Sequence, residues 1–137
     1  MFEQVRGKGH SNIRATHPTT LAATMDPEVG VAGDCFLIVS ADKSPLTLSE
    51  GFKKAARRRV KIRVRIVVGD LEDAFECYGD PKLSFEDSRT MVFRKSRYVC
   101  GKTVGVESSK SARDIDRRII RRLRDEAEAV MELIIVG

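Results

Sequence analysis

A short segment of the chain gathers the side chains best suited to acid–base chemistry. Residues 9–20 hold both histidines of the protein, His10 and His17, together with Asn12 and three threonines. Histidine titrates near neutral pH, so either imidazole could act as a general acid or base. The candidate ligand-binding residues are His10, Asn12, His17, Thr20 and Asp34. The plain alternative is that both histidines are surface residues of an ordinary loop.

A later segment is related to this one but lacks the histidines. Adding 70 to Gly9 and Thr20 gives Gly79 and Thr90. Between them, Asp80, Lys82 and Asp87 stand at the positions of His10, Asn12 and His17. A duplicated fold keeps in both copies the residues that its packing needs, so residues that differ between the copies are free to carry function. Residues 9–20 are therefore the best candidate site.

Cysteine and nucleotide-binding motifs add no further site. The three cysteines, Cys35, Cys77 and Cys100, are odd in number, form no Cys-x-x-Cys pair and lie far from both histidines in sequence. Zinc sites need closely spaced ligands, so we expect no metal and three buried, reduced thiols. The P-loop pattern and the usual hydrolase and zinc-protease motifs are absent. The sequence predicts no cofactor and leaves open whether the protein is an enzyme.

A run of basic residues is the strongest charge signal. Residues 53–65 contain eight lysines and arginines and no acidic residue. The candidates for binding an anion such as RNA are Arg57, Arg58, Arg59, Lys61, Arg63 and Arg65, which we call the basic stripe. The alternative is neutralisation, because adding 67 to Lys61 and Arg65 gives Glu128 and Glu132. No aromatic residue that could stack on a base lies beside these charges from Lys53 to Arg65. We therefore expect these charges to be paired within the chain or across a subunit contact.

Hydrophobic patterns predict the elements that must position these residues. Strands are expected at 2–8, 20–25, 34–41, 60–68, 71–78, 90–95, 102–107 and 127–136, and residues 60–68 alternate most clearly. The capping pattern Thr47-x-x-Glu50 predicts the start of one helix, and Ser111-x-x-Asp114 predicts the start of another. The apolar helix faces are Leu48, Phe52 and Ala56, and then Ile115, Ile119 and Leu123.

The order β-β-β-α-β occurs twice, which indicates an internal duplication. From Lys43 onward, adding 67 to each residue number aligns the two helices and the strands that follow them without a gap. We expect one domain, residues 1–137, made of two pseudo-repeats at about 1–69 and 70–137. The predicted fold class is α+β. It has two layers, with one mixed, mostly antiparallel sheet, both helices on one face of it, and pseudo-two-fold symmetry.

The composition is typical of a cytoplasmic globular protein. The 137 residues are 42% hydrophobic and 33% charged, with a formal net charge of +5. The longest strictly apolar run is residues 35–39, whereas a membrane-spanning helix needs about 18 apolar residues. The first residues contain no apolar core of the kind that a signal peptide has. We expect a mildly basic cytoplasmic protein without a membrane partner.

Three function classes stay open. The preferred one is a non-catalytic module that binds an anionic ligand, such as RNA, through the basic stripe. The second is a small-molecule enzyme or ligand-binding protein that uses His10, Asn12, His17 and Asp34. The third is a structural protein that forms homo-oligomers.

Four sequence blocks resemble those of a known family. They are Gly9-His10-x-Asn12, Ala15-Thr16-His17-x-Thr19-Thr20, Gly33-Asp34-Cys35 and Arg94-Lys95-Ser96-x-Tyr98-x-Cys100-Gly101-Lys102-Thr103. They are similar to blocks of an uncharacterised archaeal family, domain of unknown function 371, and the resemblance spans the full length. It implies an archaeal, cytoplasmic, stand-alone α+β protein and brings no catalytic residues. Lys102 stands where the resemblance leads us to expect arginine.

Overall fold

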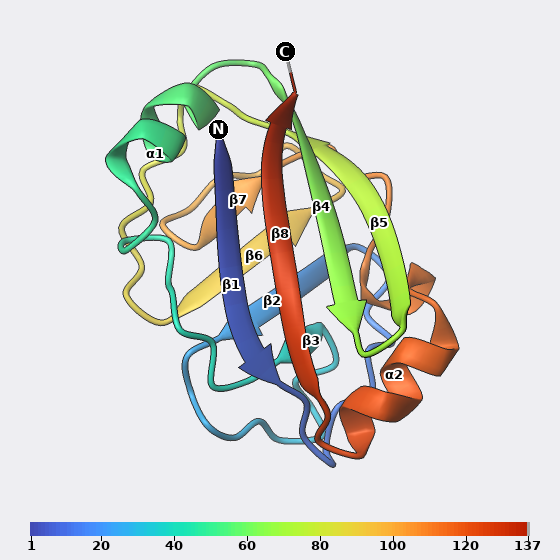
Figure 1. The fold of residues 1–137 in the computed structure, drawn as a ribbon. Coiled ribbons are helices and arrows are strands. Elements are labelled where there is room, and N and C mark those ends of the chain that lie inside the picture. The colour runs from blue at the N-terminus through green and yellow to red at the C-terminus, as the bar shows by residue number, and fades with distance from the viewer. Residues whose placement is uncertain (137) are drawn as a thin grey trace.

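The computed structural model describes residues 1–136, which form eight strands, two α-helices and one short 3₁₀ turn (Figure 1). The strands are β1 (Phe2–Lys8), β2 (Thr20–Thr24), β3 (Phe36–Ile38), β4 (Lys61–Val68), β5 (Leu71–Tyr78), β6 (Thr90–Arg94), β7 (Thr103–Gly105) and β8 (Glu128–Val136). The helices are α1 (Glu50–Ala56) and α2 (Arg117–Arg124), and the turn η1 (Ala112–Asp114) precedes α2. Every predicted strand is present, although β3 and β7 have only three residues each. Neither helix of the described range is long and apolar enough to cross a membrane.

The strands form two four-stranded sheets where the sequence predicted one. The first sheet has the order β1-β8-β4-β5 with antiparallel neighbours throughout. The second has the order β3-β2-β6-β7, in which β2 and β6 are antiparallel and the short outer strands are parallel to their neighbours. The α+β class with mixed, mostly antiparallel strands is therefore confirmed, and the single sheet is wrong. The strands on either side of α1 lie in different sheets.

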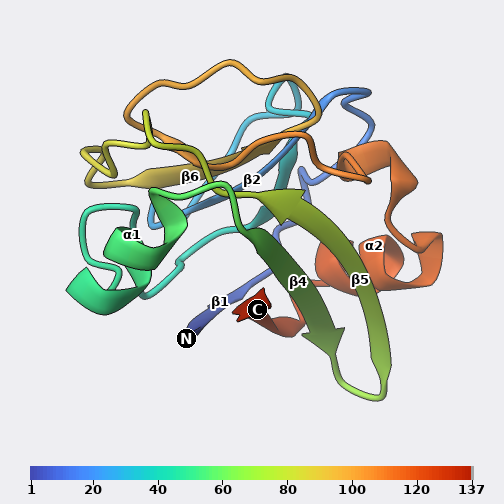
Figure 2. The ribbon, with the colours of Figure 1, turned by 90° about the horizontal axis from the view of Figure 1, so that it is seen from above.

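The two sheets pack face to face around one apolar core (Figure 2). Alternate residues of β4, such as Ile62, Val64 and Ile66, are fully buried. Phe75 of the first sheet meets Phe93 of the second edge to face, with ring centroids 5.7 Å apart. Helices of seven and eight residues are only about 10–12 Å long and could not cover a sheet of eight strands, which would be about 38 Å wide. The apolar faces of the two sheets cover each other instead.

The two helices fill the openings between the sheets. Figure 2 shows α1 and α2 at opposite sides of the molecule, each between the two sheets, rather than together on one face of a single sheet as predicted. Their apolar faces are nevertheless those read from the sequence. Leu48, Phe52, Ala56, Ile115, Ile119 and Leu123 are all buried.

Both helices begin later than the predicted capping motifs. Ser49 caps α1 and Asp116 caps α2, and their side-chain oxygens accept backbone N–H groups over 3.2 and 2.9 Å. The Ser111-x-x-Asp114 box begins the turn η1 rather than the helix. Thr47 instead accepts the backbone N–H of Ser44 over 2.9 Å. The predicted motifs therefore order the chain just before each helix.

Several contacts recur at matching places in the two halves. Lys8 and Val39 form an isolated antiparallel bridge, and Tyr78 and Val106, at the positions reached by adding 70 and 67, form another. The left-handed backbone also recurs, at Ala15 and Phe85 with φ of 51° and 53°, and at Ser40 and Glu107 with φ of 51°. These recurrences support the duplication. The duplication, its symmetry and the single domain stay predictions.

Candidate functional site

His10 stabilises the loop after β1 through a ring nitrogen. The backbone N–H of Asn12 donates to Nδ1 of His10 over 3.0 Å. At the matching place in the second half, the N–H of Lys82 donates to Oδ1 of Asp80 over 2.8 Å. The imidazole of His10 thus does the same structural work as the carboxylate of Asp80.

His17 has a matching structural role in the same loop. Its Nδ1 accepts the backbone N–H groups of Thr19 and Thr20 over 3.2 and 3.1 Å. In the second half, Asp87 accepts two N–H groups at the corresponding positions over 2.9 and 2.8 Å. Burial alone would raise the pKa of Asp87, but these N–H groups outweigh it and lower the pKa. A ring nitrogen that accepts carries no proton, so the network assigns the proton of each neutral imidazole to Nε2.

The structure separates the five predicted ligand-binding residues into two groups. The histidine hollow, of about 370 Å³, is lined by His10, Asn12, Glu28, Val29 and Gly30. His17 is not part of this lining. Its Nδ1 lies 3.0 Å from Oγ1 of Thr20, and its backbone N–H donates to the backbone carbonyl of Asp34 over 3.1 Å. The two imidazoles therefore do not share this hollow.

Much of the basic stripe is neutralised by acidic residues. Nη1 of Arg65 lies 3.4 Å from Oε1 of Glu132, its predicted partner, and Nε pairs with an acidic residue of β5. Nζ of Lys61 lies 3.6 Å from Oε1 of Glu76 on β5, rather than beside the predicted Glu128. The partner differs because the antiparallel register sets Val136 rather than Glu128 opposite Lys61 on β8, so the carboxylate comes from β5.

The rest of the stripe leaves few charges open. Arg59 pairs with Glu107. Arg58 and Arg63 are exposed, and their side chains form no ion pair or hydrogen bond with any of residues 1–136. The expectation of pairing within the chain is confirmed for Arg59, Lys61 and Arg65.

A second group of arginines lies on α2 and was not among the binding residues predicted from the sequence. Five of the eight residues of this helix are arginines. Arg117, Arg118 and Arg122 are engaged, because they donate to backbone carbonyls or pair with aspartates. Arg121 and Arg124 are exposed and have no such partner within the described range. The run of arginines is visible in the sequence, but tertiary contacts decide which of them are free.

Arg121 and Arg124 lie beside the loop that follows β1. The arginine hollow, of about 400 Å³, is lined by Ser11, Arg121, Arg124 and Asp125. Gly9 lets the loop approach α2 closely, since a Cβ at this position would collide with the backbone of Leu123. Two guanidinium groups and one carboxylate give this hollow a net positive charge.

Arg57, the counterpart of Arg124 in the first half, packs against other residues of the protein. Adding 67 to Arg57 gives Arg124. Nε of Arg57 donates to the carbonyl of Leu83 over 2.9 Å, and its guanidinium lies 5.3 Å from the ring centroid of Phe85. The first half has Ala15 at the position of Phe85. Arg124 therefore has no aromatic ring to stack on and remains open to solvent.

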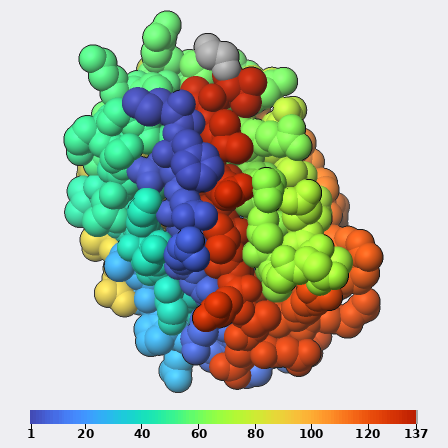
Figure 3. All heavy atoms as spheres, in the orientation of Figure 1, coloured from blue at the N-terminus to red at the C-terminus, as the bar shows by residue number. Residues whose placement is uncertain are grey.

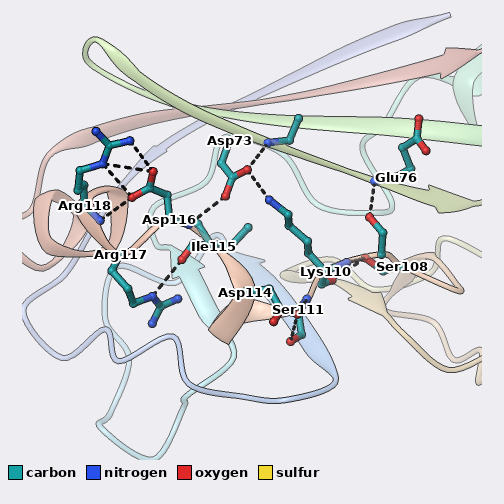
Figure 4. A network of polar contacts seen from close by, with 12 residues as sticks. Asp73, Glu76, Ser108, Lys110, Ser111, Asp114, Ile115, Asp116, Arg117 and Arg118 are labelled. Atoms are coloured by element: carbon teal, nitrogen blue, oxygen red, sulfur yellow. Dashed lines mark hydrogen bonds and ion pairs between the residues drawn. The ribbon is translucent and has the colours of Figure 1, made fainter.

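Each half has a lysine at the same repeat position, Lys43 or Lys110, and its ion pair helps to hold the start of the helix in place. Nζ of Lys110 lies 2.6 Å from Oδ1 of Asp73, and the other carboxylate oxygen accepts the N–H of Asp116 over 2.9 Å (Figure 4). In the first half, Lys43 pairs with Glu3 over 2.6 Å, and Glu3 accepts the N–H of the residue that caps α1. Because the same network occurs in both halves, the packing of the fold explains it. We therefore assign it no binding role.

Cys100 is the thiol whose surroundings favour the thiolate. Nη2 of Arg94 lies 3.4 Å from its Sγ, and the hydroxyl of Thr103 lies 3.8 Å away. Burial alone would raise the pKa of Cys100, but a backbone N–H, Thr103 and Arg94 outweigh it and lower the pKa. Burial raises the pKa of Cys35 and of Cys77. All three thiols are free, but only Cys77 is fully buried, so the prediction of three buried thiols is wrong for the other two.

Comparison with known proteins gives a consistent result. The family model described as "Domain of unknown function (DUF371)" matches residues 5–136. An uncharacterized protein of Methanocaldococcus jannaschii is 37% identical over 131 residues, which cover 96% of this chain and 97% of that protein. The resemblance seen in the sequence blocks is thus confirmed over nearly the whole chain.

Proposed function

Because the chain belongs to the DUF371 family, whose description states no activity, we propose from its geometry that it binds an anionic ligand in the arginine hollow without catalysis. Guanidinium groups are the side chains best matched to phosphate and carboxylate oxygens. The proposal moves the anion site from the basic stripe to α2. The reason is that much of the stripe already has carboxylate partners.

One observation carries the proposal. Arg124 has no partner among residues 1–136, whereas its counterpart Arg57 donates to a carbonyl and stacks on Phe85. A residue kept for packing would make the packing contact in both halves. Arg121, one turn earlier on the same helix, faces the same hollow.

Side chains rather than backbone must supply the affinity. The hollow lies at the carboxyl end of α2, where the helix dipole is negative and repels an anion. Asp125 adds a carboxylate to the lining. Both features weaken anion binding, and the two guanidinium groups must outweigh them. A ligand with two or more negatively charged groups, such as pyrophosphate or the phosphate backbone of RNA, could engage both guanidinium groups at once.

The acid–base alternative is less well supported. Each histidine uses Nδ1 to hold the loop, as Asp80 and Asp87 do in the other half. A histidine that a carboxylate can replace structurally is explained without catalysis. We therefore propose no catalytic residue.

Binding of pyrophosphate and of a labelled single-stranded RNA tests the proposal. We expect the double variant Arg121→Ala and Arg124→Ala to weaken pyrophosphate binding at least about tenfold, because two charged hydrogen bonds are lost. Asp125→Asn should tighten binding by removing a repulsive charge. The control is Arg58→Ala with Arg63→Ala, which removes two exposed, unpaired charges elsewhere and should change affinity less than about twofold.

Two outcomes would contradict this site. One is equal weakening by the two double variants, which would indicate general attraction to a basic protein. The other is no saturable binding of pyrophosphate or RNA by the wild type. Retention of RNA binding in the α2 variant, with loss in the stripe variant, would return the anion site to the basic stripe.

A further inference from the structure

The outer face of the first sheet is not covered by any other element among residues 1–136. Figure 3 looks onto this face, and β1, β8 and β4 lie side by side across it. Antiparallel sheets often leave one face to water, but that face is then mostly polar. Here Phe2 and Val136 are 55% and 46% exposed, and Val67, Val130 and Ile134 lie on the same face. The face is therefore part apolar and part charged.

The charges on this face alternate in sign from strand to strand. Side chains two residues apart share a face, which assigns each charged residue to this surface. The outward charges are Arg6 and Lys8 on β1, Glu128 and Glu132 on β8, Lys61, Arg63 and Arg65 on β4, and Glu72 and Glu76 on β5. In sheet order the strands are thus basic, acidic, basic and acidic.

We infer that this face binds a second copy of the same chain, across a two-fold axis that runs along the strands between β8 and β4. A half-turn about that axis sets basic β1 against acidic β5 of the second copy, and acidic β8 against its basic β4. Every strand then meets a strand of opposite charge. An axis along β8 itself would set basic β1 against basic β4, so the charge pattern selects the first arrangement.

The strand register supports the same arrangement in two rows of the face. Arg6, Val130, Val67 and Glu72 lie in one row across the four strands. In the two-fold pair, Arg6 faces Glu72 of the second copy, and Val130 faces its Val67. In the next row, Glu132 faces Arg65 of the second copy. These two rows match charged pairs and an apolar pair, as self-complementary interfaces require. The row of Phe2 and Ile134 instead sets apolar side chains against Glu76 and Arg63 of the second copy.

The size of the face predicts a weak dimer. Four strands about 4.8 Å apart and about 30 Å long offer a flat area of roughly 500 Å², which side-chain relief enlarges. Stable interfaces bury about 800 Å² on each partner. We therefore expect association that depends on protein concentration and weakens with salt.

A charge-exchange experiment in sedimentation equilibrium tests the inference. The wild type should show twice the chain mass of 15.3 kDa at high concentration. Arg6→Glu and Glu72→Arg should each weaken self-association at least about tenfold, because each creates two like-charge contacts in the dimer. An equimolar mixture of the two variants should associate again. In the mixed dimer, one contact joins the glutamate introduced at position 6 to the arginine introduced at position 72. The other contact joins native Arg6 to native Glu72. Both contacts therefore join opposite charges.

Lys54→Glu on α1 is the matched control, because Lys54 is exposed and outside the face. It makes the same charge change as Arg6→Glu and should leave association unchanged. A wild type that is monomeric at every concentration would overturn the inference. So would single variants that still dimerise, or a mixture that stays monomeric although circular dichroism shows both variants folded. This test is independent of anion binding, whose residues lie on α2.

Discussion

We expect that a histidine accepting hydrogen bonds at Nδ1 can be replaced by aspartate but not by alanine. Nδ1 of His17 accepts two backbone N–H groups, and Asp87 does so in the other half. We expect His17→Ala to lower the free energy of unfolding by about 1–2 kcal/mol, because two N–H groups lose their acceptor. His17→Asp should lower it by less than about 0.5 kcal/mol.

Urea denaturation of the three proteins at neutral pH measures this difference. Equal destabilisation by both substitutions would show that the imidazole itself is needed, and would return His17 to the list of candidate functional residues.

The three thiols should differ in reactivity. The lowered pKa of Cys100 gives it more thiolate at neutral pH than Cys35 or Cys77, whose pKa values burial raises. The thiolate is the reactive form, so iodoacetamide should alkylate Cys100 faster than Cys35 and Cys77. Peptide mass spectrometry after timed alkylation gives the three rates. Faster alkylation of Cys35 would contradict the assigned role of Arg94.

At the scale of elements, Glu3 joins β1 to the start of α1. Burial alone would raise its pKa, but Lys43 and the N–H of Ser49 outweigh it and lower the pKa below its usual value. A carboxyl whose pKa is lower in the folded state stabilises the fold above its unfolded pKa, and this stability is lost as the pH falls through the folded pKa.

Glu3→Gln should therefore destabilise the protein by about 1–2 kcal/mol at pH 7 and by clearly less at pH 3. Lys43→Met removes the same ion pair from the other side and serves as the matched variant. Denaturation curves at both pH values provide the test. A difference between wild type and Glu3→Gln that is the same at pH 7 and pH 3 would show that the charge of Glu3 does not matter.

The same scale shows what sequence patterns can and cannot predict. Alternation in residues 60–68 identified which side chains of β4 are buried, and the helix periodicity identified Phe52 and Ile119 as core. These patterns are local. Strand neighbours are not, so nothing in the alternation could show that β3 and β4 belong to different sheets.

The site was predictable only where the two halves could be compared. The repeat spacing correctly matched Arg65 with Glu132, because the antiparallel register of β4 and β8 sets these two residues opposite each other. It failed for Lys61, whose partner Glu76 comes from the other neighbouring strand. The free state of Arg121 and Arg124 depends on contacts that no spacing reveals.

At the scale of the whole molecule, the net charge is +5, and the basic side chains differ in whether acidic residues neutralise them. On the first sheet, lysines and arginines alternate with glutamates, which suits pairing within the chain and with a second copy. On α2, Arg121 and Arg124 face a hollow with one carboxylate beside them. Arg58 and Arg63 of the stripe are also unpaired among residues 1–136, but Arg121 and Arg124 line one hollow together.

An NMR titration of the ¹⁵N-labelled protein with pyrophosphate tests the arginine hollow most directly, because it reports which arginines meet the anion. The Nε–Hε signals of Arg121 and Arg124 and the backbone amide of Ser11 should shift together and saturate with one Kd, while the signals of Arg57, Arg58 and Arg63 stay in place. Saturable shifts centred on Arg58 and Arg63, or no saturable shift at Arg121 and Arg124, would contradict the proposed function.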